Sequence, residues 1–386
     1  MDRDATLDLI DRLLVRVETR STDLADAPMA EDVGPFLSED RHRLEVDRFF
    51  LGTPQVVGFA GQVRSPGDVL TTEVVGVPIV ICRDASGVLR AFVNACTHRG
   101  ARVADGPGST SRLTCGFHGW TYSLDGVLAG RRSADAFPPA DASCSLRPLP
   151  VSDRSGLLVV AARPDVGQEA VDSHLASIED QLVGFDLAAT TFLAERRVDV
   201  DANWKLVTGV SCESYHFATL HRTSVAQWLH DHAVFDEFGR HCRWAFPLKG
   251  IERLRDEPRS SWPAEVPGAV NHVLFPGTIL VTSGSGAQLI RAEPAGPGRS
   301  HVTYLGVHHD ATTRDAALAA YDFGGDAFER EDLVAVAQAH RGLASGASRL
   351  LIGRNEPALQ FVHRTWREQL DEATDQAPVT ARAPAG

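Results

Sequence analysis

Two short groups of metal-binding side chains constrain this chain more than any other feature of its sequence. Cys96 and His98 form a C-x-H group, and Cys115 and His118 form a C-x-x-H group after 16 intervening residues. Thiolate sulfur and imidazole nitrogen are common ligands of zinc, copper and iron in proteins. Four such ligands in two loops predict a metal centre that the loops share, so the fold of this region must bring them together.

Two kinds of metal centre are compatible with two cysteines and two histidines. A structural zinc ion takes four such ligands in a tetrahedron, but zinc fingers usually group them as a cysteine pair followed by a histidine pair. Here each group has one cysteine and one histidine, so each loop can give one ligand to each of two irons. That is the pattern of a Rieske [2Fe–2S] cluster, in which one iron takes two sulfurs and the other takes two nitrogens. We therefore predict a Rieske cluster, with zinc as the alternative.

The sequence around both loops resembles the Rieske domain of ring-hydroxylating and related non-haem iron oxygenases. The resemblance extends from Cys96 to Gly126 and includes the glycines of both loops. High-potential respiratory Rieske proteins differ, because an extra cysteine in each loop forms a disulfide. Ala101 and Phe117 stand at the matching positions here, so such a bridge cannot form. The resemblance implies that the cluster is held by Cys96, His98, Cys115 and His118.

A second candidate metal site lies in the segment E-x-x-H-x-x-x-x-H, formed by Glu213, His216 and His221. Five helical steps leave the two histidines about 140° apart, so they need a distorted turn to share one ion. Two imidazoles and a carboxylate on one face form the facial triad of non-haem Fe(II) oxygenases, which leaves open positions for O2. Taken alone, the histidines are also compatible with ordinary polar roles. Their spacing resembles the catalytic iron motif of the oxygenase family, and we predict a mononuclear iron.

The resemblance also implies roles for two carboxylates. Asp332 lies in a segment similar to the family's C-terminal helix and is the expected third iron ligand, because the adjacent Glu331 aligns less well; the alternative is a charge on a helix surface. Glu213 is not expected to bind iron. In the family, a carboxylate at its position bridges a cluster histidine to an iron histidine, usually across a subunit boundary. Glu213 would therefore link His118 of a neighbouring subunit to His216.

Two positions depart from the family pattern. Residues 209–212 (Gly-Val-Ser-Cys) occupy the stretch where relatives often carry an acidic residue or asparagine, and His340 stands where many relatives have glutamine. The hydrogen bonding around the iron site is therefore expected to differ from that of the standard family members. For this reason the resemblance does not predict a particular substrate.

Bulk properties narrow the class of protein. The 386 residues are enough for two domains with sizeable cores, and the net charge of −13 argues against nucleic acid as a partner. No apolar run approaches the length of a transmembrane helix, and the N-terminus does not read as a signal peptide. The cysteines outside the cluster show no disulfide-like spacing, so we expect a reducing, cytoplasmic location.

We predict an α+β chain in three parts. Residues 1–44 hold an N-terminal helix, indicated by apolar residues at helical spacing from Leu7 to Val17, and a polar lead-in predicted as loop over residues 22–40. Residues 45–163 form the all-β Rieske domain, with short strands and turns. Residues 164–386 form the catalytic mononuclear iron domain, for which the resemblance implies a helix-grip (Bet v1/START-like) fold with an antiparallel sheet.

The resemblance implies a terminal oxygenase component that uses O2 and electrons from a separate reductase, with or without a ferredoxin. No G-x-G-x-x-G is present, so flavin and NAD(P)H are expected on that partner. The first prediction for the substrate is a small aromatic or hydrophobic molecule that is mono- or dioxygenated; the alternatives are oxidative demethylation of a quaternary amine or methoxy compound, and a non-catalytic electron carrier. We expect a homotrimer, possibly with a beta subunit. Candidate substrate-lining residues are Phe217, Leu220 and Phe275.

Overall fold

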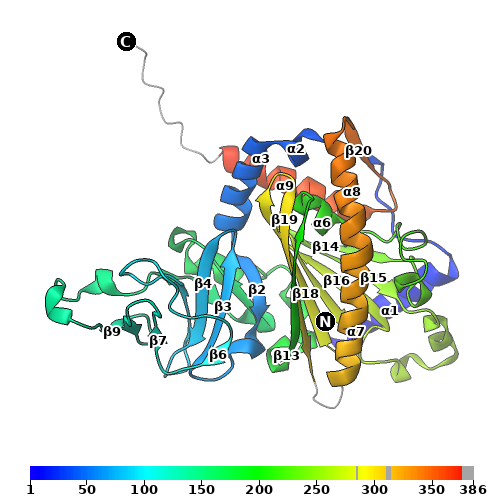
Figure 1. Ribbon diagram of the computed structural model, residues 1–386. Helices are drawn as coiled ribbons and strands as arrows, with labels where there is room; N and C mark the ends of the chain where they lie inside the picture. Colours follow the sequence, from blue (N-terminus) through cyan, green and yellow to red (C-terminus); the bar gives the residue numbers. More distant parts are fainter. Residues whose placement is uncertain (284–285, 310–313, 376–386) are drawn as a thin grey trace, which may run out of the picture.

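The computed structural model describes residues 1–283, 286–309 and 314–375. It consists of a smaller all-β domain beside a larger domain in which helices cover one broad sheet (Figure 1). None of the described helices is both long and apolar enough to cross a membrane.

The smaller domain contains three short antiparallel sheets. The five-stranded sheet has the order β10-β5-β4-β3-β6, and the two three-stranded sheets have the orders β11-β12-β2 and β7-β8-β9. Their strands are β2 (Gln55–Phe59), β3 (Asp68–Val74), β4 (Val77–Arg83), β5 (Leu89–Val93), β6 (Gly108–Ser109), β7 (Leu113–Thr114), β8 (Thr121–Tyr122), β9 (Leu128–Gly130), β10 (Pro148–Leu149), β11 (Val151–Ser152) and β12 (Leu157–Val160). The β7-β8-β9 sheet lies at the outer end of the domain (Figure 1).

The larger domain is built on a seven-stranded antiparallel sheet with the order β13-β19-β18-β17-β16-β15-β14. Its strands are β13 (Thr191–Val200), β14 (Val234–Phe238), β15 (His241–Pro247), β16 (Gly268–Leu274), β17 (Thr278–Ser283), β18 (Gly286–Gly296) and β19 (Arg299–His308). Short helices α4 (Gln168–Ser173) and α5 (Glu179–Leu182) precede this sheet. One face of the sheet packs against α6 (Trp204–Val210), α7 (Arg314–Ala327), α8 (Leu333–Ala344) and α9 (Pro357–Asp375).

The N-terminal segment packs on the larger domain. Helix α1 (Arg3–Glu18) buries its apolar stripe against β14, β15 and β16. The segment predicted as loop over residues 22–40 instead contains regular secondary structure. Its strand β1 (Met29–Asp32) pairs with β20 (Arg349–Ile352). Helices α2 (Gly34–Leu37) and α3 (Glu39–Glu45) follow β1. The prediction was wrong there because the pairing partner of β1 is distant in the sequence, so no local pattern announces the strand.

A buried ion pair fixes this segment to helix α6, which precedes the predicted iron motif. The Glu45 carboxylate is fully buried, and it accepts hydrogen bonds from Lys205 Nζ at 2.7 and 2.8 Å and from Trp204 Nε1 at 2.8 Å. Arg41 Nε donates a further hydrogen bond at 2.8 Å. A buried charge is stable only when it is paired and hydrogen-bonded, so this network specifies how the end of α3 seats against α6.

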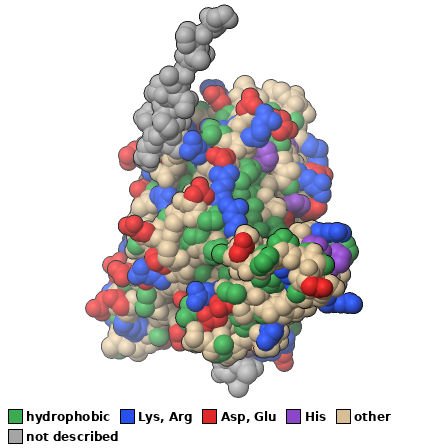
Figure 2. Space-filling view, turned by 90° about the vertical axis from the view of Figure 1, so that its left-hand side faces the viewer, with side chains coloured by type: hydrophobic (Ala, Val, Ile, Leu, Met, Phe, Trp, Pro, Cys, Tyr) green, Lys and Arg blue, Asp and Glu red, His purple; other side chains and the backbone are tan. Residues whose placement is uncertain are grey.

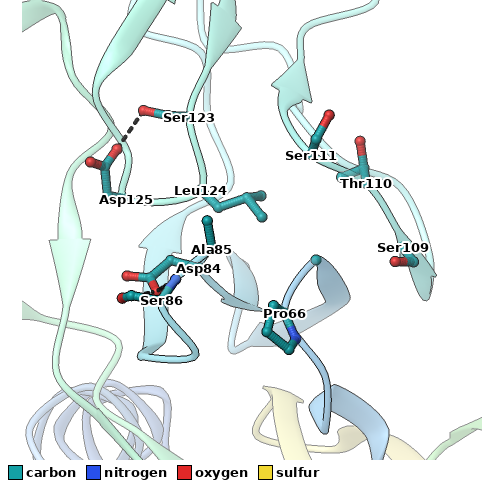
Figure 3. A pocket seen from close by; sticks show the side chains of 11 residues that line it. Pro66, Asp84, Ala85, Ser86, Ser109, Thr110, Ser111, Ser123, Leu124 and Asp125 are labelled. Carbon is teal, nitrogen blue, oxygen red and sulfur yellow. Dashed lines mark hydrogen bonds between the residues drawn. The ribbon is translucent and has the colours of Figure 1, made fainter.

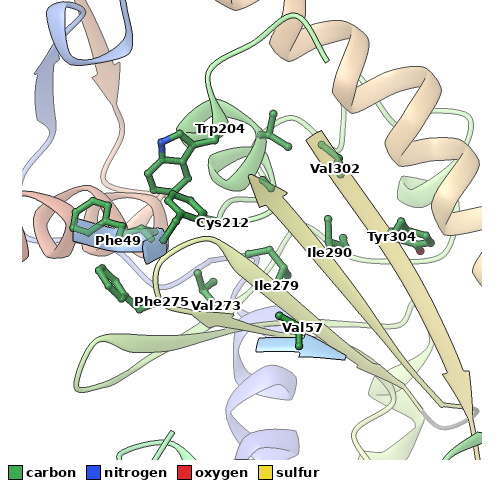
Figure 4. Close-up of a cluster of buried hydrophobic side chains, with 14 of the residues drawn as sticks. Phe49, Val57, Trp204, Cys212, Val273, Phe275, Ile279, Ile290, Val302 and Tyr304 are labelled. Atoms are coloured by element: carbon green, nitrogen blue, oxygen red, sulfur yellow. The ribbon is translucent and has the colours of Figure 1, made fainter. Parts of the chain in front are cut away.

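The two domains share one hydrophobic core. Val57 and Ile79 of the smaller domain lie in the same buried cluster as Trp204, Ile279 and Ile290 of the larger one (Figure 4). Hydrogen bonds between the β3–β4 hairpin and β18 also cross the boundary between the domains. The domains are therefore packed against each other and are not merely joined by a linker.

Polar contacts on β18 reinforce this boundary. The Arg291 guanidinium donates to Thr72 Oγ1 at 3.2 Å and to the Glu73 carbonyl at 3.0 Å, and Glu293 Oε1 accepts from Val75 N–H at 3.3 Å. Arg291 and Glu293 also form an ion pair at 3.1 Å. The tip of the β3–β4 hairpin is thus held on the sheet of the larger domain.

Candidate metal centres

Two matching turns carry the first set of predicted ligands. In each turn a glycine N–H donates to the carbonyl of the cysteine four residues earlier: Gly100 to Cys96 at 2.8 Å, and Gly119 to Cys115 at 2.9 Å. Both glycines have positive φ, 76° and 73°, a backbone conformation that side chains disfavour. Gly100 and Gly119 are therefore required by the turn geometry.

The four side chains of these turns point to a shared centre. Cys96 and Cys115 are buried in one cluster, and the His98 and His118 rings are 4.6 Å apart between centroids. Both Nδ1 atoms are buried without a hydrogen-bond partner among the described residues. A buried polar atom without a partner is costly, so two orphan imidazole nitrogens beside two buried thiols fit a bound metal centre.

The spacing of these ligands favours two metal atoms over one. In the part of the chain that the structure describes, the only set of three or more ligand atoms lying within 4.8 Å of one another is the second site, described below. Cys96, His98, Cys115 and His118 therefore do not converge on a single ion, as a tetrahedral zinc site requires. Burial, followed by the charges of His118 and Arg99, lowers the pKa of His98 and favours the neutral imidazole that binds metal.

The aromatic side chains of the domain surround the histidine side of this centre. Trp120 stacks on the His98 ring with centroids 5.0 Å apart and planes 6° from parallel, and Phe137 meets both rings edge-on. The Arg131 guanidinium lies 5.1 Å from the centroids of Trp120 and Phe137. Figure 2 faces this outer end of the domain and shows histidine side chains at one edge beside basic and hydrophobic ones. The two cysteines are thus buried, whereas His98 and His118 are half-buried beside aromatic side chains.

The second set of predicted ligands lies after α6, in a run of irregular turns. Backbone hydrogen bonds here include Leu220 N–H to the His216 carbonyl at 2.7 Å and His221 N–H to the Phe217 carbonyl at 3.2 Å. No regular helix spans residues 211–224. This is the distorted turn that the five-residue spacing of the histidines demands, and it brings their rings to 4.9 Å between centroids.

Asp332 completes this second set. Its Oδ1 lies 3.4 Å from His216 Nε2 and 3.1 Å from His221 Nε2, and the three ligand atoms are all within 4.8 Å of one another. Burial alone would lower the pKa of His221, but its hydrogen bonds to Asp332 and Glu331 raise it. The close approach of two imidazole nitrogens to one carboxylate oxygen fits a facial set for a single ion with open positions opposite. We propose His216, His221 and Asp332 as the ligands.

A widened helical turn presents Asp332 to the histidines. Residues Phe328–Asp332 form a π-helical segment (η13) between α7 and α8. Such single turns of π-helix occur frequently at functional sites. The sequence indicates a helix-borne carboxylate here but contains no signal for the π-helical turn.

Glu213 lies beside His216 near the protein surface. Its Oε1 contacts His216 Nδ1, and its Oε2 accepts hydrogen bonds from the N–H groups of Tyr215 and, at 3.2 Å, of His216. Glu213 itself is only 9% exposed, whereas Tyr215, two residues later, is 72% exposed. The carboxylate therefore contacts a proposed iron ligand from a position next to an exposed part of the chain.

Comparison with known families identifies both halves of this arrangement. Residues 53–141 match the family model for the Rieske [2Fe-2S] domain, and residues 187–372 match the model for the ring hydroxylating alpha subunit (catalytic domain). The chain belongs to the Rieske non-haem iron oxygenase family. Its two domains imply a Rieske [2Fe–2S] cluster, a mononuclear iron and O2 as co-substrate, as the sequence analysis predicted.

Curated relatives of this Rieske oxygenase include two oxygenase subunits. The glycine betaine monooxygenase oxygenase subunit of Chromohalobacter salexigens is 32% identical over 186 residues, covering 47% of this chain and 41% of that protein. The carnitine monooxygenase oxygenase subunit of Acinetobacter baumannii is 34% identical over 176 residues, covering 43% of this chain and 45% of that protein. The chain thus matches less than half the length of these relatives.

Solved structures confirm the predicted fold class. The quaternary ammonium Rieske monooxygenase CntA in complex with substrate L-carnitine has a TM-score of 0.76 at 21% identity, covering 90% of this chain and 96% of that one. Naphthalene 1,2-dioxygenase from a Rhodococcus species, bound to indole, has a TM-score of 0.73 at 17% identity, covering 94% and 98%. At such identities the likeness establishes the fold, which combines an all-β Rieske domain with a helix-covered antiparallel sheet. The boundaries after residues 44 and 163 remain our proposal.

In this Rieske oxygenase, Tyr122 touches a cluster cysteine. Its hydroxyl lies 3.2 Å from Cys96 Sγ and accepts from Thr97 N–H at 3.1 Å. Burial and the contact with Cys96 raise the pKa of Tyr122 to about 12, so the hydroxyl stays protonated and can donate to the thiolate. Hydrogen bonds to the sulfur ligands are among the features that set the potential of an iron–sulfur cluster.

Tyr122→Phe is therefore expected to lower the reduction potential of the cluster. The lost hydrogen bond stabilised the more negative, reduced state. The measurement is a redox titration of the purified protein followed by its visible absorbance, with iron and sulfide content shown to be unchanged. Thr114→Val is the control, because its hydroxyl contacts Thr121 and no cysteine. An unaltered potential in Tyr122→Phe would contradict the assignment.

The three candidate substrate residues occupy different surroundings. Phe217 is buried beside both iron histidines, with centroids 5.0 Å from His216 and 5.7 Å from His221. Leu220 is half-buried in the same turn. Phe275 instead packs edge-on against Phe49, at 5.2 Å, and lines a separate cavity at the domain boundary. Of the three, Phe217 has the placement that a substrate contact requires.

A cavity of about 420 Å³ adjoins the iron ligands through Phe217. Its lining is completed by Ala218, Arg222, Ala226, Leu229, His230, Asp231 and Lys249. A larger cavity of about 690 Å³ lies in the Rieske domain between the β4–β5 turn and neighbouring loops, lined by Pro66, Asp84, Ser86, Thr110 and Asp125 among others (Figure 3). None of the predicted metal ligands lines either cavity, but Phe217 of the smaller one contacts both iron histidines.

Proposed function

We propose that this chain is a terminal oxygenase component that oxidises a quaternary ammonium compound, using O2 and electrons from a separate reductase. The observation that carries the proposal is the set of His216, His221 and Asp332 within 4.8 Å, in a chain that also holds the Rieske ligands. An electron carrier has no need of this second ligand set. We also propose that the electrons come from the reductase either directly or through a ferredoxin.

Support for the substrate class comes from the relatives. The two relatives described above are named for glycine betaine and carnitine, and choline monooxygenase of Arabidopsis thaliana is 31% identical over 187 residues. This favours the quaternary amine that the sequence analysis kept as its alternative. The aromatic substrate that it put first has less support.

Each proposed site residue has a task in this reaction. When bound, the cluster and the mononuclear iron supply single electrons and O2 activation. His216, His221 and Asp332 would hold the iron, while Glu213 contacts His216 at Nδ1. Ligand orientation by such hydrogen bonds also raises ligand basicity.

The cavity beside Phe217 suits a substrate with two opposite charges. An aromatic face attracts a quaternary ammonium group by a cation–π interaction. Arg222 and Lys249 also line the cavity, and neither lies within 4.0 Å of a carboxylate among the residues the structure describes; Asp231 is the acidic residue there. We therefore propose a substrate with a carboxylate as well as the ammonium group, such as glycine betaine or carnitine, over choline.

A substrate panel tests this proposal. Purified protein carrying both metals is supplied with a surrogate reductase and given glycine betaine, carnitine, choline or naphthalene. We expect an oxidised product with formaldehyde or an aldehyde fragment from a carboxylated amine, detected by mass spectrometry, and weaker turnover of choline. A phenol or diol from naphthalene without turnover of any amine would overturn the substrate class.

A substitution of Phe217 tests whether the cavity recognises the positive charge of the substrate or only its size. Phe217→Leu should raise the KM for the accepted betaine by about 2- to 30-fold, the range of one cation–π contact. The isostere 3,3-dimethylbutanoate serves as the control, because it keeps the carboxylate and has a neutral carbon in place of the ammonium nitrogen; its inhibition constant should hardly change. Equal weakening of both ligands would mean that Phe217 contributes shape only.

The two metal centres of one chain face different sides of the molecule. The β7-β8-β9 sheet next to the cluster loops lies at the outer end of the Rieske domain, whereas α7 and α8 lie on the far side of the large sheet (Figure 1). We therefore propose a head-to-tail homotrimer in which Glu213 of one subunit receives the cluster of the next; a heterologous contact of this kind closes into a ring. A beta subunit is compatible with this arrangement but is not required by it.

A further inference from the structure

Glu331 contacts His221, and the sequence alone carries no indication of this contact. Its Oε2 lies 2.8 Å from His221 Nδ1, the ring nitrogen opposite the one that faces Asp332. Ser224 Oγ donates a second hydrogen bond to the same oxygen at 2.9 Å. The carboxylate is thus held by Ser224 and directed at an iron ligand.

The two histidines of the second site have matching surroundings. His216 presents Nε2 to Asp332 and Nδ1 to Glu213, while His221 presents Nε2 to Asp332 and Nδ1 to Glu331. Each imidazole therefore has a carboxylate behind it and the proposed metal position in front. His221 is the more deeply buried of the two, at 2% exposure, so its Nδ1 has less access to water as a replacement partner.

The π-helical turn explains how adjacent residues serve one site. In a regular α-helix, neighbouring side chains point about 100° apart. Within η13, Asp332 contacts the Nε2 side of His221 and Glu331 contacts its Nδ1 side. Glu329 of the same segment points elsewhere, because its carboxylate is exposed and lies 3.8 Å from the Arg196 guanidinium.

We propose that Glu331 is a positioning residue for the mononuclear iron. It holds the proton of His221 on Nδ1, which keeps the Nε2 lone pair directed at the metal, and Ser224 fixes its orientation. Carboxylates behind metal-bound histidines set the tautomer and raise ligand basicity, and their loss typically weakens metal binding about 10- to 100-fold. The alternative is that Glu331 is only a surface charge on the helix.

The test measures Fe(II) affinity, which is independent of turnover. Protein with an intact cluster and an emptied mononuclear site is titrated with Fe(II) against a competing chelator. Glu331→Ala should weaken Fe(II) binding by about 10- to 100-fold, and Ser224→Ala should weaken it less. Glu331→Gln should recover much of the loss, because its amide oxygen still accepts from Nδ1–H.

The control is Glu329→Ala, which removes a carboxylate from the same turn without touching a histidine. Unchanged Fe(II) affinity in Glu331→Ala, or an equal loss in Glu329→Ala, would overturn the positioning role. This inference rests on the proposed ligand set, but the measurement distinguishes a wrong ligand set from a wrong role for Glu331. If the unsubstituted protein binds no Fe(II) beyond its cluster, the ligand set is wrong; if it binds Fe(II) and Glu331→Ala binds equally well, only the role of Glu331 is wrong.

Discussion

Asp332→Ala is expected to reduce the iron content from about three to about two atoms per chain, with two acid-labile sulfides retained. The two histidines alone leave the ion without its carboxylate, while the cluster lies in the other domain and keeps its ligands. Substrate oxidation should fall to background. Iron and sulfide analysis, with the visible spectrum of the cluster, measures both parts of the expectation.

Asp326→Ala is the matched control for this variant. Asp326 lies in α7 shortly before the π-helical turn and pairs with Arg196 at 2.7 Å on the surface, away from the histidines. It should keep about three irons and its turnover. Full iron content in Asp332→Ala would exclude Asp332 as a ligand and would leave Glu213 and Glu331 as the carboxylates that contact the histidines.

Glu213→Gln is expected to leave both metal centres bound but to slow turnover by a factor on the order of 10 to 100 or more. The amide keeps the shape of the side chain and removes the charge that holds His216 and that would face the neighbouring subunit of the proposed trimer. The reductase should still reduce the cluster at its usual rate. Stopped-flow measurement should then show slow reoxidation of the cluster in the presence of substrate and O2. Reoxidation at the unsubstituted rate would remove Glu213 from the electron path.

Mixed assemblies test whether that path crosses between subunits. Asp332→Ala chains lack the mononuclear iron, and Cys115→Ser chains lack the cluster, so each variant alone should be inactive. Assembled together, the intact cluster of one chain can serve the intact iron site of its neighbour, and activity should return. If the two variants remain inactive when co-assembled, the electrons travel within one chain and the proposed trimer contact is wrong.

The cluster site was predictable because its information is local. The spacing of Cys96, His98, Cys115 and His118 and the glycines of both loops occupy a single short stretch. The observed turns need those glycines at positive φ. The alternation of short strands and turns likewise predicted the all-β domain, and the helical spacing of apolar residues predicted α1.

The second site was predicted only in part, because its other residues come from distant segments. Glu331 meets His221 across 110 positions of sequence, through a π-helical turn that carries no periodic signal. The same limitation affected β1, whose partner β20 is near the other end of the chain. Phe275 was chosen for its place after the iron motif, yet the fold puts it at the domain boundary. Chain order is a poor guide to which aromatic side chain borders the iron.

The core shared by the two domains has a consequence for how this oxygenase must work. Val57 and Ile79 on one side are packed with Ile279 and Ile290 on the other, and Arg291 ties the hairpin tip to the sheet. With so much apolar surface sealed at the boundary, the Rieske domain has no freedom to swing toward the iron of its own chain. If the proposed trimer carries the electrons between subunits, specific activity should fall on dilution as its subunits separate.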